Sequence, residues 1–525
     1  MDKALKMGKI SATGSFQLFF GKVVSSILLA FGSIILARVM LPAEYGIYSI
    51  ALIPPMTFGL FSDWGINQAI TKFSSNYKAL GKTENISDII ISGLIFKVTI
   101  GLLLSFSALF FANFIATTIY NRPETSVLIS IASLAILSES LLDVAQSSFI
   151  GYERMELTSY TLISQAFLKS LIGPLLVLVG YGTIGAVVGY SLSFIISALL
   201  GIALLYFQLV KNLKKTSFNL KDKIKTLKKM LSYGLPLSLS SILTSFLYQF
   251  YAFLMAFHVT DAMIGNYQIA INFSVFISFF TYPLGTVLFP AFSKLDPKKE
   301  IQLLKTVFSS AVKYAALLLV PATMVTIVLA GPVIGTVYGQ KWIEAPFFLS
   351  LYVLQNFFVL TGGMVINIFL QGVGETKFLL KLSIIRLLLG IPLAFFLIPT
   401  YGITGVIFGT FFAELPTQVL GIYWMQKKYD AKPEYKTSAK ILISSSVTAL
   451  VTYFAINNLI LADWLRLIIG GSIFLIVYLI IIPVIGAVKQ NDIQTLKAMF
   501  SNLGVLSKII NVILLIAEKV TLFRK

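Results

Sequence analysis

Apolar stretches of roughly 20 residues alternate with short polar breaks along nearly the whole chain. A helix of that length crosses the hydrocarbon core of a bilayer, which is about 30 Å thick. Counting the stretches predicts about fourteen spans, near residues 14–37, 45–68, 89–115, 126–150, 158–179, 183–208, 231–257, 262–290, 307–334, 343–370, 378–398, 402–425, 439–461 and 464–487. The pattern therefore predicts an all-α polytopic membrane protein.

Charge in the breaks alternates from one loop to the next. Lys and Arg gather in every second break, whereas the opposite breaks hold only Arg38, Arg122, Lys341 and Arg466. Basic loops stay on the cytoplasmic side, so we expect both termini there and the chain in the cell (cytoplasmic) membrane. This bias also accounts for the net charge of +19 without any nucleic-acid partner.

An internal repeat runs through the chain. A shift of 219 residues places Gly46 on Gly265 and Tyr48 on Tyr267, within LARVMLPAEYGIYSIAL (36–52) and LMAFHVTDAMIGNYQIAI (254–271). A shift of 220 places YGTIGAVVGY (181–190) on YGITGVIFGT (401–410). Six predicted spans separate each element from its copy, an even number, so the repeat is parallel about a pseudo-twofold axis along the membrane normal.

The repeat predicts how the chain is divided. We expect an N-lobe of spans 1–6, a basic cytoplasmic linker, a C-lobe of spans 7–12, two extra helices (spans 13–14) and an amphipathic cytoplasmic tail; the boundaries are 1–210, 211–230, 231–426, 427–488 and 489–525. Two similar lobes are typical of an alternating-access transporter, with the substrate site near the bilayer midplane between them.

Three stretches carry a family resemblance: LARVMLPAEYGIYSIAL, GLFSDWGINQAITKF (59–73) and FIGYERMELTSYT (149–161). Together they resemble the polysaccharide-biosynthesis membrane proteins, lipid-linked oligosaccharide flippases of the multidrug/oligosaccharidyl-lipid/polysaccharide exporter superfamily. The resemblance covers about residues 10–425. It implies a flippase, not an enzyme, that moves a polyprenyl-(di)phosphate-linked oligosaccharide from the cytoplasmic to the outer leaflet for surface polysaccharide or glycan assembly. Its partners would be that substrate and membrane lipids.

Ionisable residues inside the predicted spans are candidate functional groups. Each costs about 2.5–3.5 kcal/mol to insert and tends to face a cavity or a partner. The candidates are Lys22, Asp63, Lys97, Glu139, Asp143, Lys169, Lys313, Arg386 and Glu414. All lie in spans 1–12, which favours the two lobes as the transport path.

The basic candidates indicate an anionic cargo. A phosphate or diphosphate head group would be held by cations in a low-dielectric cavity, and the residues assigned to this role are Lys169, Arg386, Lys97, Lys313 and Lys22. Lys22, Lys97 and Lys313 lie near the inner ends of their spans, so snorkelling to the lipid head groups is an equal alternative for these three.

The acidic candidates suggest an ion site. Glu139 and Asp143 lie one helical turn apart, so a proton, Na⁺ or the ammonium group of Lys169 must neutralise them. A coupling-ion site (H⁺ or Na⁺) and a structural ion pair are equally open. Glu414 would pair with Arg386, and Asp63 is assigned to a gate.

Two other functions compete with the flippase. An ion-coupled multidrug or metabolite exporter, working as an antiporter, would share the fold. A membrane glycosyltransferase or polymerase would need a large outer loop with paired carboxylates, and the outer loops here are short and poor in acids. The sequence has no G-x-x-x-x-G-K-[ST] motif and no Cys, so we expect neither direct use of ATP nor a metal or other cofactor.

Overall fold

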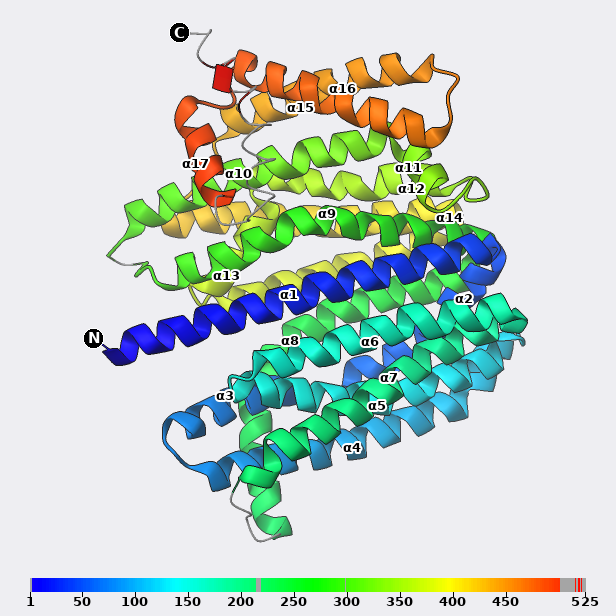
Figure 1. Cartoon of the computed structure of the whole chain (residues 1–525), viewed down its shortest axis with the longest axis vertical. Helices are drawn as coiled ribbons and strands as arrows, with labels where there is room; N and C mark the ends of the chain where they lie inside the picture. Colours follow the sequence, from blue (N-terminus) through cyan, green and yellow to red (C-terminus); the bar gives the residue numbers. More distant parts are fainter. Residues whose placement is uncertain are drawn as a thin grey trace. The chain divides into compact units, whose positions relative to one another are not determined.

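The computed structural model describes residues 2–213, 219–297, 299–500, 515, 518–519 and 521. Every element in these ranges is helical (Figure 1). The α-helices are α1 (Asp2–Val39), α2 (Pro42–Gly59), α3 (Ile66–Ala79), α4 (Thr83–Phe114), α5 (Thr125–Gly151), α6 (Met155–Leu176), α7 (Gly182–Gln208), α8 (Leu220–His258), α9 (Asp261–Ser293), α10 (Ile301–Val328), α11 (Ala330–Val337), α12 (Ala345–Tyr352), α13 (Gly363–Gly372), α14 (Thr376–Tyr429), α15 (Tyr435–Asn457), α16 (Asp463–Ile485) and α17 (Gln490–Phe500). Short η segments join several of them: η1 (Leu60–Ser62), η2 (Ile115–Ile119), η3 (Val177–Tyr181), η4 (Val210–Asn212) and η5 (Val353–Thr361).

The lengths and compositions of the helices identify the fold as that of a multi-pass membrane protein. Among the residues that the structure describes, nine helices are long and apolar enough to cross a bilayer. A tenth span is formed if the pair Ala345–Thr361 and Gly363–Gly372, bent by 56°, crosses as one. The all-α polytopic prediction is confirmed, and the count of fourteen and the cytoplasmic termini remain predictions.

Two of the long helical stretches are interrupted by glycine. α14 has 54 residues, about 80 Å at 1.5 Å per residue, far more than one crossing requires. Its backbone breaks at Gly402 (φ 56°, ψ −127°), and the boundary of α7 has the same conformation at Gly182 (φ 49°, ψ −135°). These glycines are 220 residues apart, so the two copies of the repeat share a local backbone feature as well as a sequence pattern.

The chain packs into two compact units. The first comprises Met1–Gln268 and Leu387–Gly409, and the second comprises Ile269–Arg386 and Thr410–Lys525. These units follow the packing of the helices rather than the repeat, so the division into N-lobe, C-lobe and extra helices stays a prediction.

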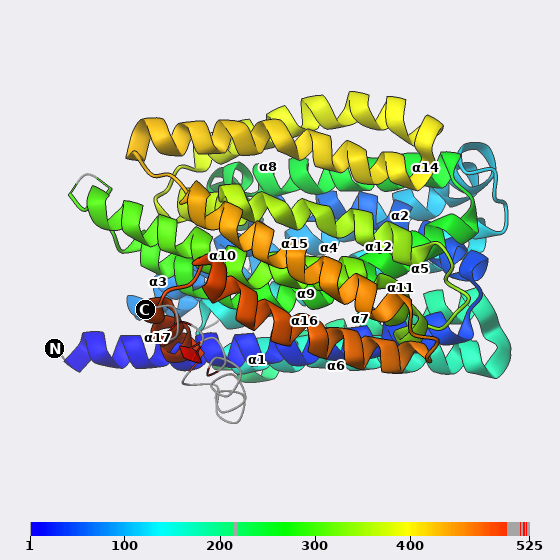
Figure 2. The same cartoon turned by 90° about the horizontal axis from the view of Figure 1, so that it is seen from above.

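In the first unit, α1 packs lengthwise on α6, side by side in both views (Figures 1 and 2). Small residues allow the close approach: a Cβ added to Gly21 would lie 2.5 Å from the Cβ of Ser159. The Ser159 hydroxyl donates a hydrogen bond to the Gln17 carbonyl at 2.7 Å, as expected where small and hydroxyl residues join membrane helices. Behind this pair, α5 packs against α4 and α7 and carries the buried face of the unit.

In the second unit, α10 packs against α15, and α15 pairs with α16. The stretch predicted as a single span at 343–370 consists of α12, η5 and α13, and the chain bends at Gly362 (φ 97°). A left-handed φ of this kind suits glycine, which has no Cβ to clash.

Two predicted polar segments are partly visible. Of the basic linker 211–230, residues 220–230 form the first three turns of α8, and 214–218 lie outside the described residues. There the ammonium group of Lys223 pairs with Asp88 of α4, which ties the segment to the first unit. The amphipathic tail is visible as α17, and most of 501–525 lies outside the described residues.

Candidate functional site

Among the described side chains of the first unit, the most deeply buried charge is the ammonium group of Lys97 on α4. Its side chain is 0% exposed, and its Nζ lies 3.2 Å from Oδ2 of Asp143 on α5 and 3.5 Å from Oδ1 of Asp63. Three segments that are distant in the sequence thus place two carboxylates around one cation. A lysine enclosed in this way is ion-paired within the protein and does not snorkel to the membrane surface.

Asn67 completes this cluster. Asp63 lies three residues before the start of α3, and its Oδ1 accepts a hydrogen bond from the Asn67 backbone N–H at 3.1 Å, so this carboxylate also caps the helix. The Asn67 side-chain amide donates to Oδ2 of Asp143 at 3.2 Å. Its own Oδ1 is buried and has no hydrogen-bond partner in the structure, which leaves one buried acceptor beside two carboxylates.

Glu139 and Lys169 extend the cluster along α5 and α6. Glu139 lies one turn from Asp143 and interacts electrostatically with Asp143, Lys97 and Lys169. The Nζ of Lys169 lies 5.0 Å from the centre of the Tyr190 ring, a cation–π distance. The structure therefore brings Glu139, Asp143 and Lys169 into one electrostatic group.

The charges of this group do not balance. Asp63, Glu139 and Asp143 provide three carboxylates, and Lys97 and Lys169 provide two ammonium groups, so one negative charge remains when all are ionised. In the part of the chain that the structure describes, no set of three or more His, Cys, Asp or Glu residues is arranged to hold a metal ion. Protonation of one carboxyl group would neutralise the excess negative charge and would require no metal-binding geometry.

A second charged pair lies in the second unit, within α14. An Arg386 guanidinium nitrogen (Nη2) lies 2.5 Å from Oε2 of Glu414, and the two side chains are 17% and 21% exposed. Glu414 also accepts a hydrogen bond from the side-chain amide of Gln418, one turn further on. The Nε of Arg386 is buried without a hydrogen-bond partner in the structure, so this guanidinium retains an unused donor.

The remaining two candidates are Lys313 and Lys22. Lys313 on α10 pairs with Asp492 of α17 at 2.7 Å, and its side chain is only 13% exposed. Lys22 lies on an exposed part of α1. The head-group role assigned to both from the sequence remains a prediction.

Sequence reasoning missed Asn67, Tyr190 and the partners of Lys97. An Asp shortly before a helix is a capping signal, which fits Asp63, but it does not indicate that the Asn67 side chain reaches Asp143. It also missed Arg122, whose guanidinium binds Asp261 at 2.6 Å and the carbonyls of Ala256 and Val259 at 2.5 and 2.8 Å. No local signal connects residues 139 positions apart.

Ion pairs within apolar spanning helices, such as that of the buried Lys97, are typical of polytopic membrane transporters. The model of one family, described as polysaccharide biosynthesis protein, matches residues 35–346, which is more than half of the chain. The chain belongs to this family, and the resemblance noted in its sequence is confirmed.

Two proteins with related sequences are similar to this chain. One is "Probable low-salt glycan biosynthesis flippase Agl15" of Haloferax volcanii, 23% identical over 247 residues, which are 45% of this chain and 50% of the relative. The chain thus spans about half the length of that protein. The other is "Stage V sporulation protein B" of Bacillus subtilis, 22% identical over 517 residues, 92% of this chain and 96% of the relative.

Solved structures show the same fold. "Lipid II flippase MurJ, inward closed conformation" has a TM-score of 0.72 at 19% identity and covers 88% of this chain and 97% of its own. A "multidrug resistance MATE family transporter of the MOP superfamily" in an inward-facing conformation has a TM-score of 0.65 at 18% identity. The match covers 77% of this chain and 94% of that transporter. At these identities the likeness concerns the fold only.

Proposed function

We propose that the protein is a flippase that moves a polyprenyl-(di)phosphate-linked oligosaccharide from the cytoplasmic to the outer leaflet of the cell membrane. The family match over residues 35–346 is the observation that carries the proposal. The flippase named among the relatives and the fold shared with the lipid II flippase support it further. Alternating access between two repeats would move the head group while the lipid tail stays in the membrane.

Lys169 and Arg386 are the residues best suited to the anionic head group. Lys97 and Lys313 are each held by carboxylates at 3.5 Å or less, so a phosphate would have to displace an existing partner. Lys169 contacts an aromatic face, and Arg386 retains a buried Nε donor beside its pair with Glu414. A guanidinium with an unused donor can add a phosphate oxygen without losing its carboxylate.

The group of Asp63, Lys97, Glu139, Asp143 and Lys169 is the proposed coupling site. Its single excess negative charge can be neutralised by a proton, and the ammonium group of Lys97 already lies between two of the carboxylates. We favour a proton over Na⁺ because the ammonium group of Lys97 occupies the position between Asp63 and Asp143 where a metal cation would bind, and Glu139 is the carboxylate that would accept the proton. Asp63, capping α3 and paired with Lys97, would transmit the protonation state to α3 in its assigned role as a gate.

Reconstitution tests the proposal directly. The full-length protein is placed in vesicles with a fluorescent polyprenyl-diphosphate oligosaccharide, and exposure of the fluorophore on the far leaflet is followed. We expect flipping faster than in empty vesicles, faster still with an inward proton gradient, and abolished by Lys169→Ala with Arg386→Ala. Flipping at the rate of empty vesicles would reject the flippase, and a Na⁺ dependence without a proton effect would reject the coupling ion.

An ion-coupled multidrug exporter is the second candidate, favoured by the fold shared with the multidrug transporter. The same vesicles distinguish the two functions when loaded with a cationic dye. Dye efflux without flipping would establish the exporter. We expect no such efflux, because the family match and the flippase named among the relatives favour a lipid-linked cargo.

A further inference from the structure

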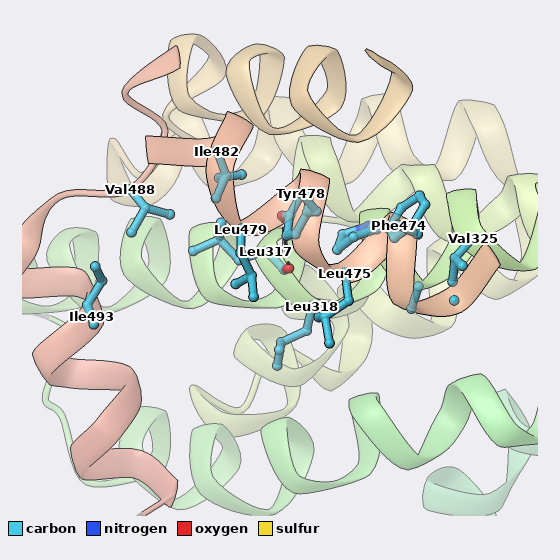
Figure 3. A pocket seen from close by; sticks show the side chains of 13 residues that line it. Leu317, Leu318, Val325, Phe474, Leu475, Tyr478, Leu479, Ile482, Val488 and Ile493 are labelled. Carbon is cyan, nitrogen blue, oxygen red and sulfur yellow. Dashed lines mark hydrogen bonds between the residues drawn. The ribbon is translucent and has the colours of Figure 1, made fainter. Parts of the chain in front are cut away.

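A partly open apolar cavity lies within the second unit, between α10 and α16, and its volume is about 460 Å³ (Figure 3). One wall comes from α10, the other from α16, and the segment that leads into α17 borders one end. The lining residues are Leu317, Leu318, Pro321, Ala322, Val325, Gly471, Phe474, Leu475, Tyr478, Leu479, Ile482, Val488 and Ile493.

The cavity wall is suited to hydrocarbon. Its one side chain with a polar group is Tyr478, whose hydroxyl donates a hydrogen bond to the Leu317 carbonyl at 3.3 Å. A water molecule needs two to four polar partners, and this wall offers none that is unused. The cavity therefore takes an apolar chain, and a membrane supplies lipid chains.

The end of the cavity at Val488 and Ile493 meets a basic cluster, formed by Lys313, Lys440 and Lys489. Between Val488 and Ile493 lies Asp492, whose Oδ2 pairs with the ammonium group of Lys313 at 2.7 Å and accepts the backbone N–H of Lys489 at 2.8 Å.

Lys440 on α15 reaches the same segment, where its ammonium group donates to the Gly486 carbonyl at 3.2 Å. The side chain of Lys489 is exposed beside it. Three ammonium groups and one carboxylate leave a net positive charge where the cavity ends. Basic pockets between membrane helices at the head-group level are suited to anionic lipid head groups.

We propose that this cavity is a binding site for an anionic phospholipid, with one acyl chain between α10 and α16 and the phosphate at Lys440 and Lys489. A methylene group needs on the order of 30 Å³, close to the share of a water molecule in the liquid, so the volume suits a chain of roughly fifteen carbons. A polyprenyl chain of many isoprene units exceeds this volume and would extend out of the open side of the cavity. The proposed occupant is thus a phospholipid rather than the transported cargo, and the proposal does not depend on the proposed function.

One glycine makes the site testable without disturbing the packing around it. Gly471 lines the cavity, and a Cβ added there meets no atom within 4 Å, whereas the neighbouring Gly470 would bring a Cβ to 2.7 Å from Leu329. Gly471→Phe therefore fills the cavity from an open position. Gly471→Ala is the matched control, because one methyl group leaves most of the volume.

The experiment measures lipid binding to the purified full-length protein by native mass spectrometry. The probes are phosphatidylglycerol, phosphatidylcholine with the same chains, and polyprenyl phosphate. We expect phosphatidylglycerol to bind in preference to phosphatidylcholine, Gly471→Phe to abolish that binding, and Lys440→Gln with Lys489→Gln to weaken it about tenfold or more. Lys432→Gln with Lys436→Gln, two exposed lysines of the same unit, should leave it unchanged.

Three results would overturn the proposal. Equal binding of the two phospholipids would mean that the lysines do not recognise the charge. Unchanged binding to Gly471→Phe, folded by circular dichroism and monodisperse, would place the lipid elsewhere. Tighter binding of polyprenyl phosphate than of phosphatidylglycerol would assign the cavity to the cargo tail. The lysine variants do not alter the cavity wall, so they test the proposal even if the phenylalanine variant fails to fold.

Discussion

Gly46 and Gly265 meet backbone to backbone: a Cβ on Gly265 would lie 3.2 Å from the amide nitrogen of Gly46 and 2.1 Å from the Pro42 carbonyl oxygen. In the reverse direction, a Cβ on Gly46 would lie 1.8 Å from the carbonyl oxygen of Asp261. Gly46 and Gly265 are 219 residues apart in the sequence, and so are Pro42 and Asp261. The repeat therefore contacts itself reciprocally where α2 and α9 begin, as two copies do at a twofold axis.

Gly265→Ala should destabilise the protein, because the added methyl group meets backbone atoms that cannot rotate away. We expect a loss of about 1–3 kcal/mol or more in the free energy of unfolding, measured by chemical denaturation in detergent. Gly59→Ala on α2 is the control, because a Cβ there meets nothing within 4 Å. A Gly265→Ala protein as stable as the Gly59→Ala protein would contradict the close contact.

Arg122 should not tolerate replacement by lysine. Its guanidinium is 14% exposed and donates to Asp261 and to three carbonyls, an arrangement that only a planar fork can satisfy. Lysine keeps the charge but leaves carbonyls unpaired, and we expect a loss of about 1–3 kcal/mol in unfolding free energy. Arg154→Lys, at an exposed pair with Glu156, should change little, and an equal loss in both variants would refute the special role of Arg122.

Lys97→Met should strongly destabilise the folded protein, and a second substitution should partly restore its stability. Without the ammonium group, Asp63 and Asp143 are left together without their cation, which typically costs about 3–5 kcal/mol. Adding Asp143→Asn removes one of the carboxylates, so the double variant should unfold at a higher denaturant concentration than Lys97→Met alone. Additive losses in the double variant would show that the three groups do not interact.

Arg386→Gln and Glu414→Gln should separate pairing from cargo binding. If the pair served only stability, the double variant would flip cargo normally once folded. We expect instead that Glu414→Gln flips cargo at a near-normal rate while Arg386→Gln raises the cargo concentration needed for half-maximal flipping about tenfold, since a charge-assisted bond is worth about 1.5–3 kcal/mol. Equal effects of the two single variants would argue for a purely structural pair.

Glu375, between α13 and α14, should make stability depend on pH in the acidic range. Burial alone would raise the pKa of this carboxyl, but hydrogen bonds from Lys428 and Tyr429 and the charge of Lys428 outweigh burial and hold the pKa below its ordinary value. A lowered pKa stabilises the folded state above the ordinary value of about 4.3, and that stability is lost as the pH falls through the folded value.

Unfolding followed between about pH 5.5 and 3 tests this, because the pKa of the unfolded carboxyl lies in that interval. Lys428→Gln should lower stability at the upper end of the range and flatten the dependence. Lys427→Gln, on the adjacent exposed residue, should keep the slope of the parent protein. Parallel curves for the parent and Lys428→Gln would exclude Glu375 as the source.

The helical class, the repeat and the identity of the buried charges follow from the sequence because hydrophobic length and residue type are local properties. The ion-pair partners of these charges do not follow from the sequence. The sequence predicts Lys97 at a phosphate or a membrane surface, yet its two carboxylates lie on other segments of the chain, 34 and 46 residues away. The α14 pair could be foreseen, since Arg386 and Glu414 lie on adjoining predicted spans. Pairs set by tertiary packing, such as Lys313 with Asp492, have no periodicity to reveal them.

The glycine breaks at 182 and 402 have a mechanical consequence. Each turns the chain within one residue or a few, so the two helices on either side are joined without a loop. A one-residue connection keeps the joined ends of the two helices together, so neither helix can slide along its axis without the other, although the angle between them can change at the glycine. An insertion at either glycine would uncouple the two joined ends.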